Sequence, residues 1–111
     1  IARVIRGEPP VIYGDGKQMR DFIFVKDVVL ANVLALESRA EGVFNIATGK
    51  ATSIKELAYL IIDILGKDLE VKYDKPREGD IRHSLGDISK AKEILGFEPK
   101  YSIEEGLKET V

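Results

Sequence analysis

The chain has 111 residues and a mass of 12.3 kDa, which suffices for one domain at most because domains run to about 100–150 residues. Its 17 Lys and Arg and 19 Asp and Glu give a net charge of -2, and this balance argues against a nucleic-acid partner, which needs a basic excess. The chain has no cysteine, a single histidine, no membrane-length apolar run and no secretory signal, so we expect no disulfide scaffold, no metal site, no membrane partner and a cytoplasmic location.

The first third of the chain predicts short elements. Residue 1 is Ile, and the apolar and basic residues 1–6 are typical of the last turns of a helix, so we expect the chain to be a fragment of a longer protein. Short strands are predicted at 11–13 and 21–25, because both runs are rich in β-branched and aromatic residues. A turn with two glycines separates them at 14–17.

The middle of the chain predicts two helices. The first, over 26–39, leaves little polar surface, so we expect it to be largely buried. A strand at 43–47 follows, and residues 20–47 are compatible with one strand-helix-strand unit. The second helix, over 53–65, begins with the capping-box sequence S-x-x-E and has one continuous apolar face.

The last part predicts a strand at 69–73, a polar loop at 74–86, a short helix from Asp87 and a final capped helix from Ser102. The short helix should turn four residues inward: Ile88, Ala91, Ile94 and Leu95. Short strands and four to five helices without strict alternation indicate a fold between α/β and α+β with a small core.

Two segments carry groups that suit a nucleotide ligand. In Tyr13–Phe22 an aromatic face able to stack a base lies near Arg20, whose guanidinium can bind phosphate in a bidentate manner. In Pro76–Arg82, Arg77 suits a pyrophosphate and Asp80 a ribose hydroxyl. Each segment also has a plainer interpretation, a β-hairpin with one exposed arginine and a solvated charged loop, and on the residues alone these are the commoner cases.

Three other features are interpreted as structural or accidental. His83 lies in a polar loop and is expected to be solvated, and Asp27 at a helix start is expected to cap that helix. Tyr13 and Lys17 match Y-x-x-x-K, but in a strand and a turn the two side chains would not share a helix face, so we treat the match as chance. No residue is assigned a catalytic role.

The ordered set of motifs resembles the C-terminal part of the nucleotide-sugar epimerases and dehydratases of the extended short-chain dehydrogenase/reductase family, with a Rossmann-type fold. Within that family it is most similar to the epimerases that interconvert UDP-glucose and UDP-galactose. The motifs are Ile12-Tyr13-Gly14-Asp15-Gly16-Lys17-Gln18; Arg20-Asp21-Phe22 with Val25 and Asp27; Phe44-Asn45-Ile46-Ala47 with Gly49; Ser53 through Leu57; Arg77-x-Gly79-Asp80; Asp87-Ile88-Ser89-Lys90-Ala91; Leu95-Gly96-Phe97 with Pro99; and Glu105-Gly106-Leu107.

The resemblance implies that residues 1–111 form the nucleotide-sugar-binding portion of such an enzyme, and it implies roles for five of them. Val11 and Tyr13 would lie beside the uracil or other base, and Arg20 would reach the phosphate and ribose. Arg77 would hold the diphosphate, and Asp80 would contact the ribose. Asp21, Asp27 and Asn45 would be structural.

The chain also departs from the family pattern. The NAD-binding glycine motif, the catalytic Tyr-x-x-x-Lys and its Ser or Thr partner lie upstream in the family, and most of the Rossmann core would lie there too. NAD would therefore be bound by the missing N-terminal part, and the isolated chain should be inactive. The resemblance further implies that the complete enzyme forms a homodimer through upstream helices.

Three alternatives stay open. One is a 4,6-dehydratase or reductase of the same family, because the residues that separate these reactions lie mostly upstream. Another is a stand-alone nucleotide-binding or interaction module without catalysis. The third is a structural fragment whose exposed apolar face makes it self-associate.

Overall fold

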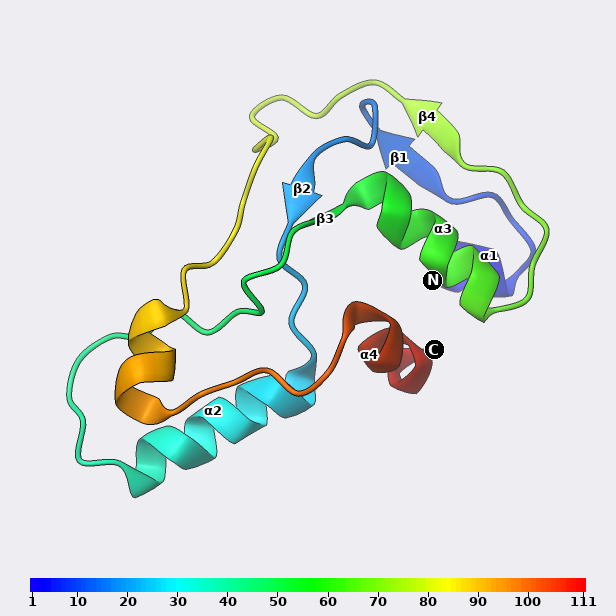
Figure 1. Ribbon diagram of the computed structural model, residues 1–111. Coiled ribbons are helices and arrows are strands. Elements are labelled where there is room, and N and C mark those ends of the chain that lie inside the picture. Colours follow the sequence, from blue (N-terminus) through cyan, green and yellow to red (C-terminus); the bar gives the residue numbers. More distant parts are fainter.

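The computed structural model describes residues 1–111 and shows a small mixed α/β arrangement (Figure 1). The helices are α1 (Ala2–Ile5), α2 (Val25–Glu37), α3 (Ile54–Ile64), the π-helix η1 (Ala91–Leu95) and α4 (Ile103–Thr110). The strands are β1 (Val11–Tyr13), β2 (Met19–Arg20), β3 (Thr52–Ser53) and β4 (Lys72–Asp74). β1 and β4 pair in parallel, whereas β2 and β3 pair antiparallel, so there are two separate two-stranded sheets.

One hydrophobic cluster lies between α3, α1 and the β1–β4 pair. Figure 1 shows these helices and strands together at one end of the molecule. The predicted capping box starts α3: the Ser53 side chain accepts from the Glu56 N–H, and the Glu56 carboxylate accepts from the Ser53 N–H. The apolar face of α3 then packs inward. The buried members of the cluster are Val4, Ile12, Ala58, Ile61, Ile62 and Val71.

A second cluster lies at the other end, between α2 and η1 (Figure 1). Its buried members are Ala31, Ala91, Leu95 and Phe97. Gly96 ends η1 in the left-handed conformation with φ of 65°, and the chain turns so that Phe97 becomes fully buried.

The molecule is flat and open. Its radius of gyration is 16.3 Å, and its extents are 48 × 30 × 16 Å. A compact chain of this length would have a radius of gyration of about 13 Å. The two clusters therefore do not merge into one core.

The expectation that the first long helix is largely buried is wrong. Val25, Val29, Val33 and Leu36 of α2 are 64%, 55%, 44% and 86% exposed. These positions form one apolar stripe at helical spacing. Only Asp27 and Ala31 of α2 are buried, because η1 and the loop that follows it cover the opposite side and nothing covers the stripe.

The strand predicted at 43–47 is also absent, although its β-type residues are present. A strand needs a hydrogen-bonded neighbour, and no segment of the chain pairs with these residues. The strand predicted at 21–25 is displaced to Met19–Arg20, where β3 supplies a partner, and α2 starts at Val25. The strand-helix-strand unit over 20–47 therefore does not form.

Two smaller predictions shift. The strand expected at 69–73 is observed at Lys72–Asp74, where the ladder with β1 sets its limits. The short helix begins at residue 89 and continues as η1; three of the four residues expected to point inward are buried, but Ile94 is 49% exposed. No helix is long and apolar enough to span a membrane.

Candidate functional site

A polar hollow of about 530 Å³ opens where β1 and β4 end. Because the two strands are parallel, with Tyr13 opposite Asp74, the loops that follow them leave the sheet side by side. Gly14 donates its N–H to the Asp74 carbonyl at 3.0 Å and takes a φ of 92°, which favours glycine. The loop after β4 then passes over the loop after β1, and both loops line the hollow.

A smaller hollow of about 250 Å³ adjoins the first. All five residues singled out in the sequence line it, namely Val11, Tyr13, Arg20, Arg77 and Asp80. Three of them, Tyr13, Arg77 and Asp80, line both hollows. The fold thus brings together groups that lie in two separate segments of the sequence.

The Arg77 guanidinium lies over the Tyr13 ring, with its carbon 4.2 Å from the ring centroid. This is a cation–π contact, which leaves the guanidinium N–H groups free for an anion. The Arg77 guanidinium forms no hydrogen bond or ion pair with any residue of the chain, although the Arg77 carbonyl accepts from the Asp80 N–H at 3.2 Å. Arg20 and Arg82 are each paired with a carboxylate, so Arg77 is the arginine of the site whose charge is not neutralised.

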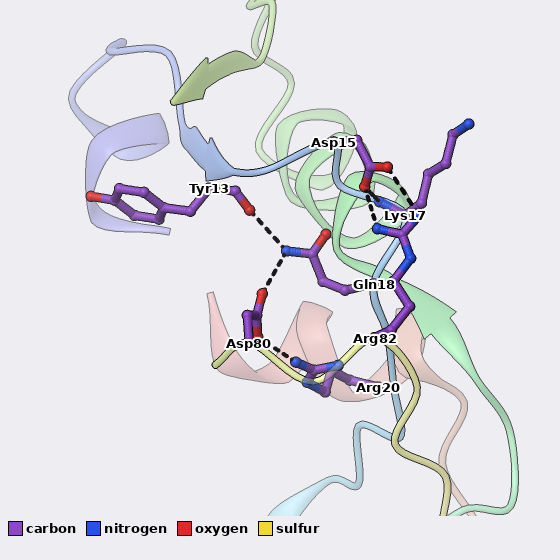
Figure 2. A network of polar contacts seen from close by, with 7 residues as sticks. All are labelled: Tyr13, Asp15, Lys17, Gln18, Arg20, Asp80 and Arg82. Atoms are coloured by element: carbon purple, nitrogen blue, oxygen red, sulfur yellow. Dashed lines mark hydrogen bonds and ion pairs between the residues drawn. The ribbon is translucent and has the colours of Figure 1, made fainter. Parts of the chain in front are cut away.

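Arg20 and Asp80 form an ion pair across the site (Figure 2). Arg20 Nη2 donates to Asp80 Oδ1 at 2.7 Å, and Arg20 Nη1 donates to the Met19 carbonyl at 2.7 Å. The two charged side chains are 25% and 33% exposed, so the pair is partly shielded from water. Arg20 comes from β2 and Asp80 from the loop after β4, so this contact joins the two segments.

A second ion pair joins the same segments. Arg82 donates to both oxygens of Asp15 at 2.8 and 2.9 Å, and the Lys17 N–H donates to Asp15 Oδ1 at 2.8 Å (Figure 2). These bonds, led by that from Arg82, lower the pKa of the Asp15 carboxyl from 3.8 to about 2. Arg82 in turn has its pKa raised by Asp15.

Gln18 lies between these pairs and is only 7% exposed. Its Nε2 donates to the Tyr13 carbonyl at 3.0 Å and to Asp80 Oδ2 at 3.1 Å (Figure 2). Sequence reasoning assigned no role to Gln18, Asp15 or Arg82. Their only signal was their position inside the two segments, and their partners lie 62 and 67 residues away.

The acidic residues interpreted as structural do hold the fold together. Asp27 is 1% exposed, and its carboxylate accepts from the backbone N–H groups of Lys100 at 2.8 Å and Tyr101 at 3.1 Å. It therefore ties α2 to a distant loop, and the cap predicted at its own helix start has no side-chain hydrogen bond. Asp21 accepts from the N–H groups of Thr48 and Gly49, both at 2.8 Å.

His83 is exposed and makes a backbone bridge with Met19. Tyr13 and Lys17 lie on a strand and in a turn, as expected for a chance match to Y-x-x-x-K. The loop after β1 leads into β2 and not into a helix, and the chain has no G-x-G-x-x-G sequence. These residues therefore do not form the strand-loop-helix cradle that a dinucleotide such as NAD needs.

The site can bind an anion and hydroxyl groups. Arg77 offers N–H donors without a competing carboxylate, and Asp80 offers acceptors in a partly shielded setting. Tyr13 adds an aromatic face, and Val11 a small apolar surface beside it. This set of groups suits a phosphate-bearing ligand that also carries hydroxyls and a ring.

Comparison with known proteins finds a family model and several relatives that are similar to this chain. A family model described as GDP-mannose 4,6 dehydratase matches residues 1–110. A putative UDP-glucose 4-epimerase of Methanocaldococcus jannaschii is 44% identical over 100% of this chain and 36% of its own length. A UDP-glucose 4-epimerase of Mycolicibacterium smegmatis is 39% identical over 97% of this chain and 35% of its own. The chain thus spans about a third of the length of these curated relatives.

Solved structures give the same result. The UDP-glucose 4-epimerase of Thermotoga maritima, solved with UDP-glucose, is 52% identical with a TM-score of 0.90, and the match covers 96% of this chain and 34% of that one. A UDP-N-acetylglucosamine 4-epimerase of Methanobrevibacter ruminantium, in complex with UDP-N-acetylmuramic acid, is 48% identical with a TM-score of 0.92, over 98% of this chain and 35% of that one.

Proposed function

This chain belongs to the nucleotide-sugar epimerase and dehydratase family, and from that membership we propose that it binds the nucleotide diphosphate of a UDP-sugar. The observation that carries the proposal is the hollow that Val11, Tyr13, Arg20, Arg77 and Asp80 line together. The relative from Thermotoga maritima was solved with UDP-glucose, which supports the choice of ligand.

Each group has a role that follows from its chemistry. Arg77, which no carboxylate neutralises, would bind the diphosphate, and Arg20 would add a second positive charge beside it. A charge-assisted contact of this kind contributes about 1.5–3 kcal/mol. Asp80 would accept from a ribose hydroxyl. Tyr13 and Val11 would lie beside the base.

We further propose that this binding serves a UDP-glucose 4-epimerase, as in the relatives from Methanocaldococcus jannaschii and Mycolicibacterium smegmatis. Family members such as the UDP-glucuronic acid 4-epimerase of Bacillus cereus are solved with NAD. The residues of this chain do not form an NAD cradle, so the chain's own part would be to hold the nucleotide while the chemistry takes place on residues supplied elsewhere. We expect the 111 residues alone to convert no UDP-glucose.

Isothermal calorimetry with UDP and UDP-glucose tests the binding. We expect the chain to bind both, and Arg77→Ala to weaken binding about 10- to 150-fold, the equivalent of the contact it loses. Arg39→Ala is the matched control, because Arg39 is an exposed arginine two residues beyond the end of α2, and its loss should leave the affinity unchanged. Equal losses in the two variants, or no binding by the unaltered chain, would refute the proposed site.

The family model's own description motivates a second ligand. The affinity for GDP-mannose is measured in a separate titration, since the model that matches residues 1–110 is described as a GDP-mannose 4,6 dehydratase. Tighter binding of GDP-mannose than of UDP-glucose would overturn the choice of uracil and favour a dehydratase of the same family.

The mass of the native protein separates an enzyme part from a stand-alone module. A mass far above 12.3 kDa in the source would support a role within a complete epimerase. A native mass of 12.3 kDa would favour the stand-alone nucleotide-binding module.

A further inference from the structure

Gln18 is one of two buried side chains in the chain that are polar or charged, the other being Asp27. Asp27 has a structural explanation, because its carboxylate binds two backbone N–H groups. Gln18 has a different pattern. Both hydrogens of its amide nitrogen are used, whereas its amide oxygen Oε1 is buried without any partner.

The orientation of the amide follows from its neighbours. Nε2 faces the Tyr13 carbonyl oxygen and a carboxylate oxygen of Asp80, and both of these groups can only accept. Turning the amide over would place Oε1 against two other oxygens and lose both bonds. Only one orientation of the amide keeps both hydrogen bonds, and in that orientation Oε1 points away from Tyr13 and Asp80.

The two ends of the amide contribute differently. The unpaired, buried oxygen disfavours folding, whereas the nitrogen makes two hydrogen bonds that join the loop after β1 to the loop after β4. The amide nitrogen donates to Asp80 Oδ2 while Arg20 donates to Oδ1, so both oxygens of the Asp80 carboxylate are held by hydrogen bonds (Figure 2). The same nitrogen also holds the end of β1 at Tyr13.

We propose that Gln18 is a positioning residue that orients the Asp80 carboxylate toward the ligand hydroxyls and sets its place relative to Tyr13. The inference rests on the proposed nucleotide-binding function and deepens it. Gln18 acts through Asp80, so its effect on binding should require the Asp80 carboxylate.

The first test needs no ligand. Gln18→Met keeps the bulk and removes both donors, which should loosen the loop that carries Asp80. We expect limited trypsin digestion to cut after Arg77 at least five times faster in the variant, with cutting after Arg39 unchanged as the internal control. A faster cut at both arginines would indicate a general structural role, and no change at either would show that the amide does not hold the loop; both outcomes overturn the proposal.

The second test is a double-mutant cycle on the affinity for UDP. Gln18→Met should weaken binding about tenfold in the unaltered chain and have no further effect once Asp80→Asn is present. Equal losses in the two backgrounds would overturn the proposal. Absence of UDP binding by the unaltered chain would refute the proposed function, and the trypsin ratio would then still decide whether Gln18 positions the loop of Asp80.

Discussion

The buried carboxylate of Asp27 gives a prediction whose magnitude follows from its contacts. It is 1% exposed and accepts from the N–H groups of Lys100 and Tyr101 at 2.8 and 3.1 Å. A hydrogen bond to a charged group contributes about 1.5–3 kcal/mol, so the two together contribute about 3–6 kcal/mol. A chain of this length has a total stability of about 6–17 kcal/mol at about 0.05–0.15 kcal/mol per residue.

We therefore expect Asp27→Ala to unfold the part of the chain around α2. Asp27→Asn is the more informative change, because the amide keeps the size and one acceptor but turns an N–H₂ group toward a backbone donor. It should lower the stability of this region by about 1.5–3 kcal/mol, the share of one bond.

Hydrogen exchange measured at single residues is the suitable assay, since it reports directly on the Lys100 and Tyr101 amides. A loss of 1.5–3 kcal/mol corresponds to exchange about 10- to 150-fold faster at those two amides. The amides of α3, which pack in the other cluster, serve as the control and should not change. Unchanged protection at 100 and 101 in Asp27→Asn would refute the reasoning.

Three further predictions concern the loops and the best-defined helix. The ion pair with Arg82 lowers the pKa of the Asp15 carboxyl to about 2, so the pair stabilises the fold fully above pH 4 and this stabilisation is lost as the pH falls toward 2. Asp15→Asn should therefore reduce the drop in melting temperature between pH 4 and pH 2. The same drop in the variant and in the unaltered chain would contradict a stabilising Asp15–Arg82 pair. A Cβ at Gly86 would lie 2.4 Å from the Cβ of Ala47, so Gly86→Ala should lower the free energy of unfolding in urea by about 1–3 kcal/mol. If this overlap is the cause, adding Ala47→Gly should restore much of the lost stability. Ser53→Ala removes the capping box of α3 and should cost about 1 kcal/mol of helix stability by circular dichroism, whereas a stability equal to that of the unaltered chain would argue against the cap.

The helices that were predicted well are those whose information is local. The capping boxes at Ser53 and Ser102 lie within four residues of the helix start, and both are observed. Strands depend on partners that local sequence does not specify. Residues 43–47 have the composition of a strand but no neighbour to pair with, whereas β4 forms where β1 lies beside it.

The candidate site also has features that the sequence predicts and features that depend on distant partners. Side-chain chemistry alone pointed to Tyr13, Arg20, Arg77 and Asp80, and the resemblance added Val11 and the individual roles. The fold places all five around one hollow. The contacts between them follow from the parallel pairing of β1 and β4, which no local pattern predicted. The burial of Gln18 could not be predicted from the sequence, because a glutamine in a polar turn is usually exposed and the loop that carries Asp80 is what covers it.

The separation of the two hydrophobic clusters determines how cooperatively the chain unfolds. A single transition requires that the unfolding of one part removes contacts from every other part. Here the two clusters share no residue, and the α2–η1 half is joined to the β1–β4–α3 half by loops, by the Asp27 contact and by α4, whose Leu107 packs against the first cluster and whose Glu109 pairs with Lys26 of α2. The halves should therefore open as two units with different free energies. The candidate site lies wholly on the β1–β4–α3 half, so a bound nucleotide would delay the unfolding of that half and leave the opening of α2 unchanged.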